Sequence, residues 1–193
     1  IWIRLKENIC FICLCMTGFP PSKSEWTRGL SWGSLRWTAL LRSALWLCMV
    51  RVSFREAAPT VRGWHTRTLL FVLDYVPNAS AEAIDQTGEE FFRVLRNAHP
   101  LVPVVFVEDP IFPHSAFDNA ILKEINEKNA AQKRLFRKLR RSGERRIYYV
   151  GAEGMIGDDG EATVDGIHFT DLGAVRYVEH ILPVVRKALH KTE

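Results

Sequence analysis

The stretch VPVVFVED, Val102 to Asp109, is apolar at almost every position and ends in two acids. A strand with one face in water alternates apolar and polar residues, whereas a strand of a parallel sheet is covered on both faces and is apolar throughout. This stretch therefore predicts a buried strand of a parallel sheet. It also places Glu108 and Asp109 at the carboxyl end of that strand.

Two more stretches have the same character, TLLFVLDY at residues 68–75 and RIYYVGA at residues 146–152. The first is bounded by Pro77 and Asn78, which are turn residues. Helical spacing of apolar residues follows each strand, as βαβ units require. Strands that alternate with helices of this length predict right-handed crossovers, a parallel sheet and an α/β fold.

The helix boundaries carry their own signals. Ser80 is a suitable N-cap for the first helix, and a long helix is expected from about Asp118 to Arg141, ended by Ser142-Gly143. The last helix is expected from about Thr170, as its cap, to Leu189. Pro183 lies inside it and is expected to kink or divide it.

The composition changes sharply near residue 66 of this 193-residue chain. All six tryptophans and all four cysteines precede this point, and the first aspartate is Asp74. We interpret residues 1–66 as an atypical segment and residues 67–193 as the α/β domain. Our hypothesis is that the first segment is not the native partner of the rest and is a wrong-frame reading of a GC-rich coding sequence.

Charge and hydropathy exclude some function classes. The net charge of +4 does not by itself indicate a nucleic-acid partner, and no run of about 18 apolar residues predicts a membrane span. Cys10 and Cys13 form a C-x-x-C without a second pair, so no zinc site is expected. A basic run on the long helix is more typical of a solvated face than of a nucleic-acid interface; it comprises Lys133, Arg134, Arg137, Lys138, Arg140, Arg141, Arg145 and Arg146.

Candidate site residues follow the strands. Ligands of open parallel sheets bind beyond the carboxyl ends of the strands, and the loops there carry Asn78, Glu108, Asp109, Asp165 and His168. Their convergence on one edge is the main argument from the residues for a site.

Asp165 and His168 have the spacing of an orienting acid and a general base. A carboxylate bonded to one imidazole nitrogen fixes the tautomer and stabilises the cation formed when the other nitrogen takes a proton. The alternative is an exposed aspartate beside a histidine at a helix start. Asn78 is either an ordinary turn residue or a side-chain amide donor to an oxyanion. Acids at Glu108, Asp109 and Asp171 keep a metal-assisted alternative open, although no spacing is diagnostic of a metal.

The segments LLFVLDYVPN, VPVVFVEDP and GDDGEATVDGIHFTDLGAVRY, taken together, resemble the SGNH/GDSL hydrolases, in particular the bacterial GDSL-like lipase/acylhydrolases. The resemblance extends from about Thr68 to Leu189. It implies a flavodoxin-like three-layer α/β/α fold with a parallel sheet, whose N-terminal strands are missing or altered here. One departure is Phe169, where the family usually has proline after the catalytic histidine.

The resemblance also implies a serine esterase mechanism without a metal or organic cofactor. Asp165 and His168 then correspond to the catalytic acid and base, and Asn78 to the oxyanion donor. The implied substrate is a small-molecule, carbohydrate or lipid ester.

The family's nucleophile lies on a Gly-x-Ser turn after an earlier strand. GLSWGSLRW offers Ser31 and Ser34, but no apolar strand precedes them. Little esterase activity is therefore expected from this chain, and the alternative function is a non-catalytic remnant or binding domain.

Overall fold

Three parallel strands form the centre of the structure, a computed structural model that describes residues 2–4, 10–13, 49–55 and 66–190, with side chains described from Leu69 onward. The strands pair in the order β4, β5 and β6, and their bounds are Thr66–Leu73, Val104–Val107 and Ile147–Val150. The registers Val72–Val105 and Val105–Tyr148 align all three in one direction. The predicted buried parallel strands are confirmed.

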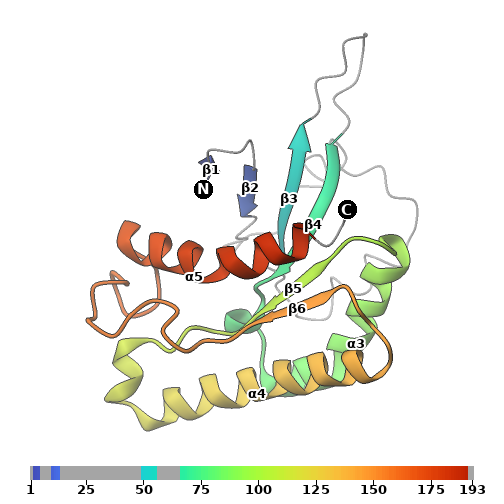
Figure 1. Cartoon of the computed structure of the whole chain (residues 1–193). Coiled ribbons are helices and arrows are strands. Elements are labelled where there is room, and N and C mark those ends of the chain that lie inside the picture. Colours follow the sequence, from blue (N-terminus) through green and yellow to red (C-terminus); the bar gives the residue numbers. More distant parts are fainter. Residues whose placement is uncertain (1, 5–9, 14–48, 56–65, 191–193) are drawn as a thin grey trace, which may run out of the picture.

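Helices cover both faces of these strands (Figure 1). Their bounds are Ala81–Ala98 for α3, Asn119–Arg141 for α4 and Asp171–His190 for α5. Two short 3-10 turns lie in the connecting loops, η1 (Val76–Asn78) after β4 and η2 (Pro113–Ala116) before α4. The three-layer α/β/α arrangement expected from the resemblance is confirmed.

Two apolar cores separate these layers, and alternate residues of each strand enter opposite cores. Leu70 and Val72 of β4 pack in the core that contains Ile181 and Val185 of α5. Their neighbours on β4 enter the other core, with residues of α3 and α4; Phe71, Leu73, Phe92 and Leu135 belong to it. Burial on both faces is the physical reason that residues 70–73 of β4 and all of β5 are apolar.

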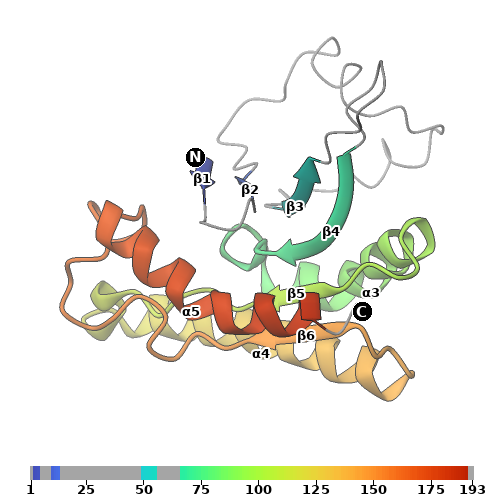
Figure 2. The same cartoon turned by 45° about the horizontal axis from the view of Figure 1, so that its top comes forward.

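The sheet continues beyond β4 with three antiparallel strands, so within the described residues it is mixed. They are β1 (Trp2–Arg4), β2 (Cys10–Cys13) and β3 (Met49–Arg55). Figure 2 shows β3 and β4 running in opposite directions, in agreement with their register. Ser31 and Ser34 lie outside the described residues.

The helix ends follow the expected local chemistry. The Ser80 hydroxyl accepts a hydrogen bond from the Ala83 amide, and Asp118 caps α4 through the amides of Ala120 and Ile121. Gly143 ends the long helix with a φ of +98°, which glycine adopts without strain.

The expectation that Pro183 divides the last helix is wrong, because α5 is continuous from Asp171 to His190. Pro183 is exposed on the outer side of α5. There water can satisfy the carbonyl that loses its amide partner, so the helix tolerates the proline.

Candidate active site

The loop between β6 and α5 carries Asp165 and His168 beyond the carboxyl end of β6 (Figure 1). The segments before and after the turn are joined, because the Val164 amide donates to the His168 carbonyl (2.8 Å) and Thr163 pairs with Phe169. Gly166 turns the chain between them with a φ of +93°. The Asp-Gly pair is thus the local signal for this turn.

Asp165 holds the histidine with both carboxylate oxygens. Its Oδ1 accepts the backbone amides of Ile167 (3.0 Å) and His168 (2.8 Å), and its Oδ2 lies 2.6 Å from Nδ1 of His168. The His168 amide, the His168 ring and the Ile167 amide together hold the pKa of Asp165 well below its usual range. An ionised carboxylate only accepts, so the proton of this bond belongs on Nδ1 and leaves Nε2 as the acceptor.

The imidazole is open to solvent. The side chain of His168 is 72% exposed and that of Asp165 is 52% exposed. The ring is therefore oriented from one side by Asp165 and accessible from the other. Such a ring can take a proton from a group that approaches Nε2.

Thr170 ties this loop to the start of α5. Its amide donates to the Ala162 carbonyl (2.9 Å), and its hydroxyl accepts from the Gly173 amide (3.0 Å), which confirms the expected cap. Gly173 packs so closely that an added Cβ would lie 1.9 Å from the Ala162 oxygen. The loop is therefore packed directly against the first turn of α5.

A second set of contacts joins α5 to the earlier part of the loop, around Asp159. The sequence analysis did not predict it. Arg176 of α5 donates to both carboxylate oxygens of Asp159 at 2.6 Å and to the Ile156 carbonyl at 3.1 Å. The bonds from Arg176, more than the other contacts, lower the pKa of Asp159 to about 2. No short motif marks a pair separated by 17 positions, so only the folded chain shows it.

The other sequence-selected acids do not join the pair. Glu108 turns inward, where its oxygens accept from the Tyr149 hydroxyl (2.5 Å) and the Ala152 amide (2.8 Å). Asp109 is buried, and its backbone amide and carbonyl bond to the Asn129 side chain. Within residues 66–190 and the other described segments, no three His, Cys, Asp or Glu side chains gather as metal ligands. The metal-assisted alternative therefore has no geometric support in that part of the chain.

Asn78 ends the η1 turn after β4, on the same side of the sheet as the Asp165–His168 loop (Figure 1). Its amide donates to the Tyr75 carbonyl (3.0 Å), and its side chain is exposed. The buried Tyr75 hydroxyl donates to Gln132 of α4 (2.6 Å) and anchors the turn from below. No hydrogen bond among the described residues joins Asn78 to the pair.

Comparison with known proteins identifies the relatives of this fold. The model of the GDSL-like Lipase/Acylhydrolase family matches residues 65–186, which is more than half of the chain. The chain belongs to this family. The family is one of ester hydrolases, so the resemblance read from the sequence is confirmed at that level.

A solved structure supports the same assignment. The chain is similar to a Bacteroides ovatus protein assigned as a GDSL-like lipase, with 28% identity and a TM-score of 0.62. The alignment covers 65% of this chain and 37% of that protein, so the chain spans well under half of its length. No curated protein matches. No helix among the described residues is long and apolar enough to cross a membrane.

Proposed function

We propose that this member of the family is a serine-dependent ester hydrolase in which His168 is the general base. The observation that carries the proposal is the oriented and exposed imidazole, held at Nδ1 by Asp165 at 2.6 Å. In acyl transfer such a ring takes the proton of an attacking hydroxyl at Nε2 and later gives it to the leaving alcohol. The ionised Asp165 stabilises the imidazolium in between.

Asn78 is proposed as an oxyanion donor. Negative charge develops on the carbonyl oxygen during attack, and a side-chain amide held at that position stabilises it. An exposed amide on a turn anchored by the buried Tyr75 is suited to this role. The proposed substrates are small esters, including acyl groups on carbohydrates or lipids.

The test is hydrolysis of p-nitrophenyl acetate by the full chain. His168→Ala is expected to lower kcat/KM by roughly 10²–10⁴-fold, since it removes the base. His190→Ala is the matched control, because His190 is exposed in the last turn of α5. Chelator is expected to leave the rate unchanged, and a serine-directed phosphonate is expected to label one serine, which peptide mapping then identifies.

The alternative is a non-catalytic remnant of an esterase. Its support is that no apolar strand precedes Ser31 of Gly29-Leu30-Ser31 or Ser34 of Gly33-Ser34. A folded chain that neither hydrolyses the ester nor reacts with the phosphonate would favour the remnant and overturn the proposed activity. Rates lost on chelation would instead point to a metal-assisted hydrolase.

A further inference from the structure

A groove of about 400 Å³ lies at the opposite end of the sheet from the Asp165–His168 loop. Its lining comes from the second halves of α4 and α5, from Arg145 and from β6. Figure 1 shows β6 between these two helices. Arg145 and Ile147 in its lining lie at the amino end of β6, whereas the loop with His168 follows the carboxyl end. The groove is therefore separate from the proposed active site. Its volume is within the range of small-molecule sites.

Three cations line this groove, and no acidic side chain does. They are Arg140 of α4, Arg145 of the following loop and Lys187 of α5. None of the three forms an ion pair with a carboxylate within the described part of the chain. Uncompensated positive charge in a concave site attracts anions, because the low-dielectric walls focus the field.

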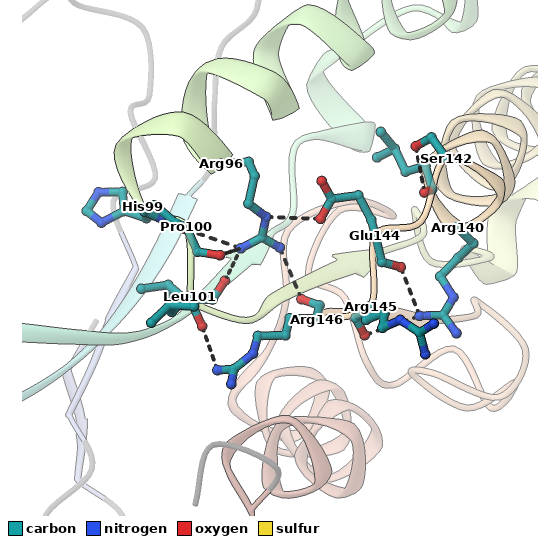
Figure 3. A network of polar contacts seen from close by, with 11 residues as sticks. Arg96, His99, Pro100, Leu101, Arg140, Ser142, Glu144, Arg145 and Arg146 are labelled. Atoms are coloured by element: carbon teal, nitrogen blue, oxygen red, sulfur yellow. Dashed lines mark hydrogen bonds and ion pairs between the residues drawn. The ribbon is translucent and has the colours of Figure 1, made fainter.

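The backbone holds Arg140 in place. Its Nη1 donates to the carbonyls of Glu144 (3.0 Å) and Arg145 (3.2 Å), as Figure 3 shows. Nη2 and Nε have no protein partner among the described residues. A guanidinium that is fixed by one nitrogen while others stay available is ready to bind an oxyanion at a small entropic cost.

Glu144, the one acid in the loop between α4 and β6, pairs with a residue outside the groove. The Glu144 carboxylate bonds to Nε of Arg96 at 3.2 Å (Figure 3). Arg96 also donates to the Val102 carbonyl at 2.6 Å, so it is anchored to the α3–β5 connection. Glu144 therefore serves that connection and does not neutralise the groove.

Aromatic rings supply the apolar part of the lining. Phe136, Tyr148 and Tyr149 all contribute, and the rings of Phe136 and Tyr149 lie 4.9 Å apart. The Tyr149 hydroxyl is bonded to Glu108, which fixes this ring. A groove with rings and cations suits a ligand that has a flat apolar body and a negatively charged group.

We propose that this groove binds a small organic anion that joins an oxyanion group, such as a phosphate, to an aromatic body. The cations bind the oxyanion, and the rings pack against the flat part.

Phenyl phosphate is the test probe, added to the ¹⁵N-labelled full chain at low ionic strength and followed by NMR. We expect saturable shifts of the amides of Ile147–Val150 and of the neighbouring turns of α5, with a Kd on the order of a millimolar for so small a ligand. Inorganic phosphate and phenol, which carry the anionic half and the aromatic half of the probe, are each expected to bind at least about fivefold more weakly.

Lys187→Glu is expected to weaken phenyl phosphate binding about tenfold, since it replaces an attractive charge by a repulsive one. Arg186→Glu is the matched control, because Arg186 is the exposed neighbour that does not line the groove. The proposal is overturned if shifts are absent or lie elsewhere, or if both variants weaken binding equally. It is also overturned if inorganic phosphate binds as tightly as the probe. Ester hydrolysis does not enter these measurements, so they stand apart from the proposed function.

Discussion

Asp109 is a buried acid with a side-chain oxygen that has no hydrogen-bond partner. The pKa of Asp109 is raised to about 7, chiefly by burial; the positive charge of Lys128 opposes the rise, and the negative charges of Asp74 and Glu124 add to it. Lys128, the main influence that lowers this pKa, also pairs with Glu124 at 2.6 Å. The folded chain therefore favours the protonated form of Asp109 into the neutral range.

This raised pKa predicts a pH-dependent stability. An unfolded aspartate ionises near pH 3.8, so the folded state loses stability as the pH rises from there through about 7. The loss is on the order of a few kcal/mol, because one pKa unit corresponds to about 1.4 kcal/mol. Asp109→Asn is expected to remove this loss. The free energy of unfolding of the variant, minus that of the parent, should therefore be larger at pH 8 than at pH 4.

Urea unfolding at a series of pH values checks this expectation. Asp158→Asn is the control, because Asp158 is an exposed acid of the loop before α5. Parallel stability curves for the parent and Asp109→Asn would show that Asp109 ionises normally in the folded protein.

At the scale of elements, α4 holds two loops at the carboxyl ends of the strands. Asn129 bonds to both backbone groups of Asp109, at 2.7 and 2.9 Å, and Gln132 accepts the Tyr75 hydroxyl. The helix thereby sets the positions of the loop that leads to Asn78 and of the loop after β5. These contacts come from polar residues on the buried face of α4. The apolar periodicity of the sequence does not reveal them.

Removing the hydrogen bonds of Asn129 to the Asp109 backbone is expected to destabilise the fold. Asn129→Ala leaves a buried amide and a buried carbonyl of Asp109 without partners, so we expect a loss of about 2–4 kcal/mol in the free energy of unfolding. Asn126→Ala changes an exposed asparagine of the same helix and is expected to be nearly neutral. If the two substitutions changed the free energy of unfolding equally in urea titrations, the proposed role of Asn129 would be wrong.

The contact between α5 and the Asp165–His168 loop gives a second prediction at this scale. Gly173→Ala places a methyl group where the Ala162 carbonyl lies, so the loop or the helix must shift. We expect a loss of about 1–3 kcal/mol or more and a disturbed Asp165–His168 bond, visible in the Nδ1 proton resonance of His168. Val175→Ala, at an exposed position two residues further, is the control. An unchanged resonance in Gly173→Ala would show that the loop is positioned independently of α5.

At the scale of the whole molecule, opposite charges gather at opposite ends. Residues 151–171, which form the Asp165–His168 loop and the first residue of α5, contain six acids and no Lys or Arg, whereas residues 133–146 contain eight Lys or Arg and one acid. The basic end is where the groove along β6 lies. Separation of charge along the sheet is consistent with two sites that take different ligands.

The boundary near residue 66 carries the last prediction. The family match begins at residue 65, beside the point where the composition changes. We expect that another reading frame of the DNA encoding residues 1–66 specifies an apolar strand followed by Gly-x-Ser and a second glycine block. The other frames of the DNA encoding residues 67–186 are the control and should specify neither. Absence of both features from the two upstream frames would refute the frameshift hypothesis.

The sequence by itself determined the three parallel strands, the helices between them, the caps at Ser80 and Thr170, and the pairing of Asp165 with His168. These features depend on periodicity and on contacts between residues a few positions apart, which are visible in a linear pattern. It misjudged Pro183 because tolerance of a proline depends on which side of the helix faces solvent.

Only the tertiary structure decided the inward turn of Glu108, the burial of Asp109, the Arg176–Asp159 anchor and the groove between α4, β6 and α5. The partners that decide the first three features lie 17 or more positions apart, and the groove joins residues of α4 and β6 to Val184 and Lys187 of α5. Their meeting depends on how helices pack on the sheet, and packing energy is a property of surfaces that come together only in the folded chain.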